Sequence, residues 1–172
     1  MIGKKAWLSL SCLNCIEVNS TFYHLPRKST ISSWKEFPQR VTVFLKAPRT
    51  ITHQKRLKGV KSLWKEFWER VEPLGNTLAG VLFQTPPSFA YSDKNLERIL
   101  DMKEYLPKSL RVAFEFRNAS WFNKKVVSAF RRMKFCLAGT YINKKKGSKW
   151  MGNMPPGIHI PEKTASFTYL RV

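Results

Sequence analysis

The segment from Arg111 to Phe122, RVAFEFRNASWF, places two charged residues inside a run that is otherwise typical of a buried strand. Alternate residues of a strand lie on the same face, so Glu115 and Arg117 point in the same direction. An apolar core tolerates charged groups only when they are paired. Two interpretations follow: either these residues form a buried ionic network that closes the end of the sheet, or they converge on a ligand.

Segments of the same apolar character recur along the chain, with helical patterns between several of them. The predicted strands are Cys15–Thr21, Val41–Ala47, Ala79–Thr85, Arg111–Arg117, Phe135–Thr140 and Phe167–Val172. The predicted helices are Ser29–Phe37, Gly59–Leu74, Asp93–Leu106 and Trp121–Met133, where apolar residues recur at intervals of three and four. Strands that alternate with helices predict a parallel sheet with right-handed crossovers.

A doubly wound sheet and a (β/α) barrel both fit this pattern. A complete barrel has eight strands and takes about 250 residues, whereas this sequence has 172 residues and six predicted strands. The sheet is therefore either open or part of a barrel. No linker divides the chain, so we expect a single domain over residues 1–172. A further helix is expected near Trp7, and Asn143–Gly157 is expected to form a surface connection.

Charge and cysteine content limit the partners and the setting. The formal net charge of +20 favours a polyanionic partner, a nucleic acid above all, although a lysine-rich surface also serves solubility. The three cysteines form no disulfide framework, which favours a reducing, cytoplasmic setting. The pair Cys12 and Cys15 is too small a set for a tetrahedral metal site. No segment is long and apolar enough to cross a membrane, and nothing indicates an oligomeric state.

Polar side chains gather toward the carboxyl ends of the predicted strands, where ligand sites form in parallel α/β folds. They are Glu17, Asn19, Lys46, Gln84, Glu115, Arg117 and Arg171. We expect them to meet in one ligand site. No P-loop, dinucleotide fingerprint or Ser-His-Asp order is present to specify a cofactor or a reaction.

Several kinds of chemistry remain open for such a site. Lys46, Arg117 and Arg171 suit a phosphate or a carboxylate. Glu17 and Glu115 could act as general acid and base. They could instead bind a hard divalent cation, together with the side-chain carbonyls of Asn19 and Gln84.

One histidine is a further catalytic candidate. His53 follows the second strand in RTITHQKRL and suits a general base or a metal ligand, although a hydrogen-bonded turn residue is the commoner role of such a histidine. Two carboxylates with one histidine are a thin set for a catalytic metal, so we predict no metal site.

Five blocks of the sequence resemble the YecE-like family, the domain of unknown function numbered 72. They are IEVNSTFYHLP (16–26), FLKAPRTITHQKRL (44–57), GVLFQTPPSF (80–89), VAFEFRNASW (112–121) and YLRV (169–172), in the family's order. The resemblance spans roughly Ala6 to Val172. It implies a TIM barrel similar to xylose-isomerase and AP-endonuclease barrels, and it implies no reaction, since the family's activity is not established.

The resemblance also bears on the missing strands and on aromatic residues. Family members open with a strand of the type G-T-S-G-W and continue beyond the Arg171 motif, so the chain is expected to be an incomplete barrel that lacks the first and eighth strands. Matching positions include Thr21, Tyr23, Thr52, Trp121 and Tyr169. Tyr23 and Trp121, with Phe22, are candidates to stack on a base or a sugar.

Two functions are therefore predicted, with an inactive fragment as a third alternative. The first is binding of an anionic ligand, a phosphorylated small molecule or a nucleic acid, at the barrel mouth. The second is a metal-independent acid/base enzyme that uses Glu17, Glu115 and His53 on a small sugar-like or anionic substrate. Three histidines and two aspartates count against a metal-dependent nuclease.

Overall fold

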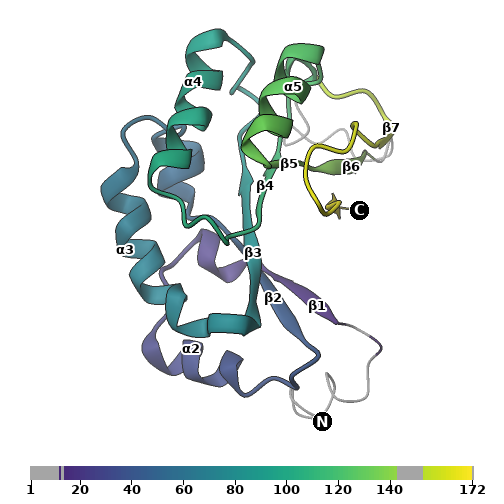
Figure 1. The fold of residues 1–172 in the computed structure, drawn as a ribbon. Coiled ribbons are helices and arrows are strands. Elements are labelled where there is room, and N and C mark those ends of the chain that lie inside the picture. Colours follow the sequence, from purple (N-terminus) through teal and green to yellow (C-terminus); the bar gives the residue numbers. More distant parts are fainter. Residues whose placement is uncertain (1–11, 13, 143–152, 172) are drawn as a thin grey trace.

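Five parallel strands form the central sheet of the computed structural model, which describes residues 12, 14–142 and 153–171. The strands lie in the order β1-β2-β3-β4-β5 and span Cys15–Val18, Thr42–Lys46, Leu78–Gln84, Val112–Glu115 and Cys136–Leu137. Neighbours in the sheet are also consecutive strands, as expected for right-handed βαβ units (Figure 1). The predicted α/β fold is confirmed.

Four helices connect the strands and cover one face of the sheet. They are α2 (Lys28–Lys35), α3 (Lys61–Val71), α4 (Asp93–Asp101) and α5 (Lys124–Met133). Side chains of Ser92 and Asn123 cap α4 and α5 by accepting the backbone N–H of Asn95 and Val126, respectively. The predicted helices were too long at several ends, because short 3-10 turns occupy Glu72–Thr77, Met102–Glu104 and Ala119–Trp121.

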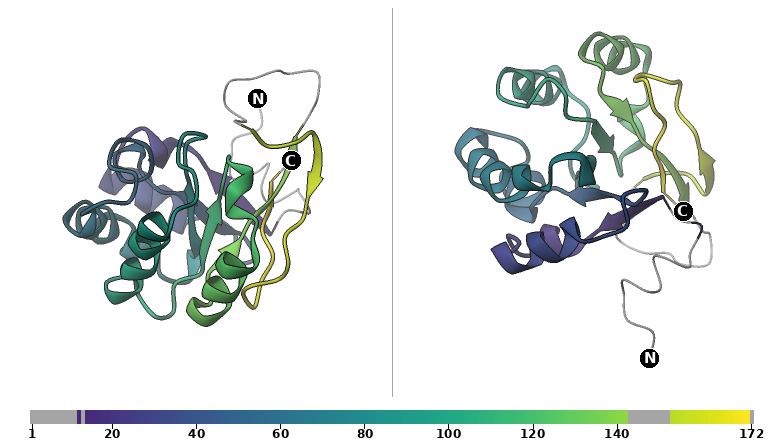
Figure 2. Two further views of the ribbon diagram at one scale, coloured as in Figure 1. Left: turned by 90° about the horizontal axis from the view of Figure 1, so that it is seen from above. Right: turned by 60° about the horizontal axis from the view of Figure 1, so that its bottom comes forward.

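Alternation along the strands divides the core between two faces. On the helix-covered face Val43, Leu45, Val81 and Phe83 join the large cluster packed against α2 to α5. On the other face Phe44, Leu82, Ala113 and Cys136 form a smaller cluster, covered by residues 165–169 of the C-terminal segment. Figure 2 shows the strands in an arc, with the helices outside it and the C-terminal segment on the opposite side. This curvature is that of an incomplete barrel.

A glycine permits the close approach of strands on the inner face. A Cβ atom at Gly80 would lie 2.5 Å from the carbonyl oxygen of Arg111 and 2.5 Å from the Phe44 ring. Phe44 and Gly80 are partners in the register of β2 and β3, so the aromatic ring takes the space that a side chain would need.

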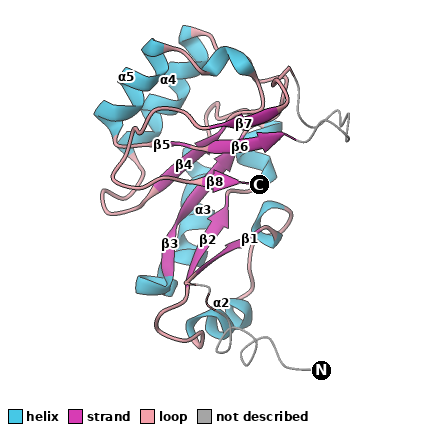
Figure 3. Cartoon of the chain, turned by 90° about the vertical axis from the view of Figure 1, so that its right-hand side faces the viewer, coloured by secondary structure: helices cyan, strands magenta, loops and turns pink. Residues whose placement is uncertain are grey.

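A second, three-stranded sheet extends the arc beyond β5 (Figure 3). Its order is β7-β6-β8, with β6 at Gly139–Ile142, β7 at Gly157–His159 and β8 at Leu170–Arg171. The predicted strand Phe135–Thr140 is thus divided at Ala138, and the predicted last strand is shorter than expected. Strand β7, which pairs antiparallel with β6, was not predicted.

Some expectations fall outside the described residues: the helix near Trp7, and residues 143–152 of the surface connection. Of the described part of that connection, Gly157 begins β7 instead of remaining in a loop. Cys12 and Cys15 are free and exposed, and Cys136 is free and buried. None of the described helices is long and apolar enough to span a membrane.

Candidate functional site

Seven polar side chains from five strands and their following residues define the polar rim: Glu17, Asn19, Lys46, Gln84, Glu115, Arg117 and Arg171. Strand register places them on the inner face, because Glu17 is the partner of Phe44 and Gln84 is the partner of Glu115. Each lies at or just beyond the last residues of its strand, next to the small inner cluster. The small apolar cluster on the inner face therefore packs directly against the polar rim.

Arg171 is the centre of the polar rim. Its Nη2 lies 3.1 Å from Glu17 Oε1 and 3.4 Å from Asn19 Oδ1. Its Nη1 lies 3.3 Å from Glu115 Oε2 and 3.4 Å from Gln84 Oε1. Strand β8 thus contacts β1, β3 and β4 through one guanidinium, and the Arg171 side chain still keeps 26% of its surface exposed.

Glu115 has the most enclosed side chain of this group, with 0% exposure. It is ion-paired with both Arg117 and Arg171. Glu115 and Arg117, the two charged residues within the apolar run at residues 111–117, are therefore paired with each other. Arg171 of β8 provides the third charge. A buried carboxylate needs such partners, because its desolvation is otherwise uncompensated.

Lys46 lies on the same face with its ammonium over an aromatic ring. Its Nζ is 4.2 Å from the centre of the Phe22 ring, a cation–π contact. Burial, followed by repulsion from Arg171, lowers the pKa of Lys46 to about 8, although Glu115 and Glu17 act in the opposite direction. Thr21 fixes the loop that carries Phe22, since its hydroxyl donates to the Lys46 carbonyl oxygen at 2.7 Å.

His53 contacts the same Phe22 ring and the neighbouring Thr52, and the charges that act on it are those of Lys46 and Arg49, not of the carboxylates. Its ring meets the Phe22 ring edge-on, with centres 4.9 Å apart, and its Nδ1 is 2.9 Å from Thr52 Oγ1. Burial and the nearby charges of Lys46 and Arg49 lower the pKa of His53 to about 4, so the imidazole is neutral at neutral pH. The structure thus does not bring His53 together with Glu17 and Glu115 as one acid/base set.

Two of the three aromatic candidates, Tyr23 and Trp121, lie in opposite environments. Tyr23 is 67% exposed and contacts Phe22 edge-to-face at 5.0 Å. Trp121 is 0% exposed, stacks on Phe116 at 4.1 Å and donates its indole N–H to the Phe89 carbonyl at 2.6 Å. The expectation that Trp121 stacks on a ligand is therefore wrong for this structure: its ring is part of the core.

Tyr169 joins the polar rim, although no role was assigned to it from the sequence beyond the family match. Its hydroxyl donates to Glu17 Oε2 at 2.5 Å, and burial together with this hydrogen bond raises the pKa of the phenol. The signal was present in the sequence, because Tyr169 precedes Arg171 by two residues and so shares its face.

Replacing Tyr169 by phenylalanine should lower the free energy of unfolding by about 1.5–3 kcal/mol, the usual range for a hydrogen bond to a charged group. The ring contact with Phe44, at 4.7 Å, should remain. Urea unfolding of the two proteins measures the difference. Tyr141→Phe is the matched control, since Tyr141 is exposed, and it should change stability by less than about 0.5 kcal/mol. Equal effects of the two substitutions would contradict a structural role for the Tyr169 hydroxyl.

No group of three or more His, Cys, Asp or Glu side chains that could hold a metal ion occurs within the described parts of the chain. Asp93, at the start of α4, is instead ion-paired with Lys125 on the surface, with 2.6 Å between its Oδ1 and Nζ. The polar rim can offer a bound molecule cationic and amide hydrogen-bond donors. Its two carboxylates already contact Arg171.

An α/β barrel with one polar end is the class of protein that these features define. The family model described as "Protein of unknown function DUF72" matches residues 5–172, so the chain belongs to the DUF72 family. This confirms the resemblance found in the sequence.

Relatives in other organisms agree with this assignment. The UPF0759 protein YecE of Escherichia coli (strain K12) is 30% identical over 112 residues, which are 64% of this chain and 40% of YecE. The DUF72 family protein EF0366 of Enterococcus faecalis V583 has a TM-score of 0.75 at 19% identity, over 92% of this chain and 58% of its own. The DUF72 family protein TM1631 of Thermotoga maritima MSB8 has a TM-score of 0.73 at 25% identity, over 98% of this chain and 62% of its own. The chain therefore spans less than two thirds of each of these proteins.

Proposed function

We propose that the polar rim binds an anionic ligand of the phosphate-ester class, a phosphorylated small molecule or a nucleic acid. The observation that carries this proposal is the charge balance of the rim. Lys46, Arg117 and Arg171 supply three cations, whereas Glu17 and Glu115 supply two carboxylates, which leaves one positive charge in excess. All four of the other charges act on Lys46: burial and then repulsion from Arg171 lower its pKa, Glu115 and Glu17 raise it, and Arg117 lowers it.

The contacts of Arg171 further support the proposal. Charge-assisted N–H···O bonds are usually about 2.7–2.9 Å long, whereas those of Arg171 range from 3.1 to 3.4 Å. The guanidinium is thus shared among four loosely held acceptors. An anion that displaces one of the amide oxygens, at Asn19 or Gln84, would gain a shorter bond to a charge that is already in place.

The pH dependence of sulfate binding tests this function. Sulfate is the suitable probe because its own charge is constant near neutral pH. Its affinity should fall by about tenfold between about pH 7 and about pH 9, as Lys46 loses its proton near its pKa of about 8. Isothermal titration at constant ionic strength measures the change. Lys46→Met should bind more weakly at pH 7 and should lose this pH step.

Lys65→Met is the matched control for Lys46→Met. Lys65 lies on α3 in an exposed ion pair with Glu69, so its loss should leave both the affinity and the pH step unchanged. If Lys46→Met and Lys65→Met bind sulfate equally well, the anion does not lie at the polar rim and the proposal is wrong.

A short single-stranded oligonucleotide separates the two forms of the ligand. Nucleic-acid binding should weaken with salt, with a slope of about −0.7 per phosphate contact for single strands. If the polar rim makes one of those contacts, Lys46→Met should reduce the slope by that amount, whereas Lys65→Met should not. A slope that both variants leave unchanged would restrict the proposal to small phosphorylated ligands.

The alternative, a metal-independent acid/base enzyme, has one specific observation in its favour. The hydrogen bond from Tyr169 to Glu17 places a phenol and a carboxylate together at the edge of the polar rim. However, Glu115 is enclosed by two arginines, and the contacts of His53 are with Phe22 and Thr52. Anion binding needs only the displacement of one amide oxygen from Arg171 and leaves both carboxylates in place, and it is therefore the function that the geometry supports best.

A further inference from the structure

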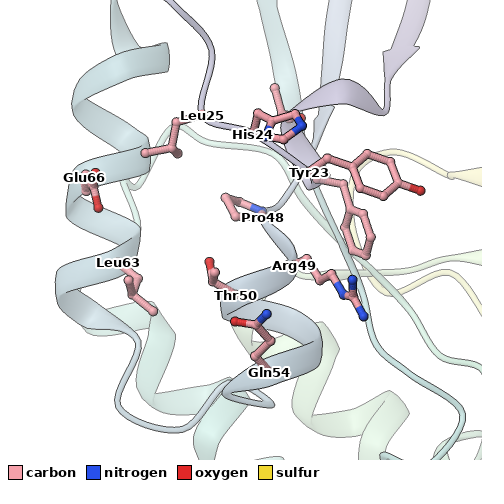
Figure 4. Close-up of a pocket in the computed structure, with 11 residues that line it drawn as sticks. Tyr23, His24, Leu25, Pro48, Arg49, Thr50, Gln54, Leu63 and Glu66 are labelled. Carbon is pink, nitrogen blue, oxygen red and sulfur yellow. The ribbon is translucent and has the colours of Figure 1, made fainter.

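A pocket of about 420 Å³ lies beside the polar rim, between the loop after β1, the turn after β2 and helix α3 (Figure 4). The loop contributes Thr21–Leu25, and the turn is the π-helical segment Thr50–Gln54 with Pro48 and Arg49 before it. Helix α3 contributes Leu63 and Glu66. The volume falls in the range of small-molecule sites, about 300–1,000 Å³.

The lining of this pocket combines apolar walls with a few polar groups. Leu25, Pro48 and Leu63 offer apolar contact. Around them the hydroxyl of Thr50 and the amide of Gln54 offer hydrogen bonds, as Figure 4 shows. Apolar walls with a small number of convergent polar groups are typical of a site for a ring-shaped ligand.

The charge of the lining argues against a phosphate inside the pocket. Glu66 would repel an anion, but its carboxylate suits the N–H groups of a nitrogen heterocycle. The cation of the pocket, Arg49, does not face Glu66: Figure 4 shows its guanidinium directed away from α3, on the same side as the Tyr23 ring. The pocket is therefore suited to a neutral, hydrogen-bonding ring, and its positive group is directed away from α3, on the side of Tyr23.

One aromatic ring connects the pocket with the polar rim. Phe22 lines the pocket, and the Lys46 ammonium lies 4.2 Å from the centre of the same ring. The neighbouring residue Thr21, also in the lining, is hydrogen-bonded to the Lys46 backbone. His53 contacts Phe22 and responds to the charges of both Lys46 and Arg49, so these two cations lie near the same point.

We propose that this pocket binds the nitrogenous base of a nucleoside phosphate whose phosphate group is held at the polar rim by Lys46 and Arg171. The inference rests on the anion-binding function proposed above and names its ligand class. The base lies against Leu63 and Pro48 with Glu66 as a hydrogen-bond acceptor, and the exposed Tyr23 ring and Arg49 flank the sugar and phosphate between the two subsites.

A binding panel of inorganic phosphate, adenosine and the four ribonucleoside 5′-monophosphates tests this ligand class. At least one nucleotide should bind about tenfold or more tightly than inorganic phosphate, because the base adds apolar burial against Leu63 and Pro48 and a hydrogen bond to Glu66. Leu63→Trp, which fills the pocket from α3, should reduce nucleotide affinity to that of inorganic phosphate and leave phosphate binding unchanged. Lys65→Trp, on the exposed side of the same helix, is the matched control and should bind like the original protein.

The outcomes separate the pocket from the polar rim. If every nucleotide binds no more tightly than phosphate, or if Leu63→Trp binds nucleotide as well as Lys65→Trp does, the pocket inference is wrong and anion binding at the rim stands. If Leu63→Trp abolishes binding of adenosine and nucleotide while Lys46→Met changes neither, the pocket stands as a nucleoside site, and both the rim proposal and its role in holding the phosphate are overturned. If neither phosphate nor any nucleotide binds, both proposals fail.

Discussion

Replacing Glu115 by glutamine should lower the free energy of unfolding by about 3–5 kcal/mol, the usual cost of removing one partner of a buried ion pair. Glu115 has no exposed surface and is paired with both Arg117 and Arg171. Glutamine has nearly the same shape but no charge, so two guanidiniums would lose the carboxylate between them. The mutual repulsion of these cations, and not a cavity, would cause the loss.

Urea unfolding followed by tryptophan fluorescence measures this effect. Glu69→Gln is the matched control, because Glu69 has the same chemistry in an exposed i,i+4 pair with Lys65. It should change stability by less than about 0.5 kcal/mol. If the Glu115→Gln protein is as stable as Glu69→Gln, water screens the repulsion between Arg117 and Arg171, and the predicted cost is wrong. Because Glu115→Gln is expected to destabilise the fold, Lys46→Met is the better probe of function.

Replacing Trp121 by alanine should be comparably destabilising, by about 3–5 kcal/mol, because it removes a large buried ring and leaves a cavity. The ring stacks on Phe116 and on Phe89, with centres 4.1 Å and 5.3 Å apart, and its N–H bond to the Phe89 carbonyl would also be lost. Trp121→Phe should cost less, because it retains most of the stacked area.

Tyr23→Ala should have the opposite effect to substitution of Trp121, because Tyr23 is proposed to contact the ligand and Trp121 belongs to the core. Tyr23 is exposed, so this substitution should change stability by less than about 1 kcal/mol. It should weaken nucleotide binding, whereas Trp121→Phe should leave the affinity of the folded protein unchanged. Weaker nucleotide binding by Trp121→Phe, with Tyr23→Ala unaffected, would reverse the roles assigned to these two rings.

The alternation of residues along strands was enough to predict most of the polar rim. Glu17 and Asn19 share a face, as do Glu115 and Arg117, and all lie near carboxyl ends of parallel strands. The register then brings Gln84 opposite Glu115. These placements depend only on strand geometry, which the local pattern of apolar and polar residues specifies.

The positions of Trp121 and His53 depend on contacts between distant segments, which no local pattern specifies. Trp121 follows a strand end, but the 3-10 turn Ala119–Trp121 directs its ring toward the Phe89 carbonyl. His53 lies in a π-helical turn that directs it toward Phe22. The pocket lined by Phe22 is likewise formed by three separate segments and was therefore not predicted at all.

The bonds between the first and last described strands have a consequence for folding. Tyr169 and Glu17 are 152 positions apart, as are Arg171 and Asn19. Bringing together groups so distant along the chain has a high entropic cost, so such contacts tend to form late. During refolding we therefore expect the α/β units to form first, and the capacity to bind an anion to be acquired only in the last kinetic phase.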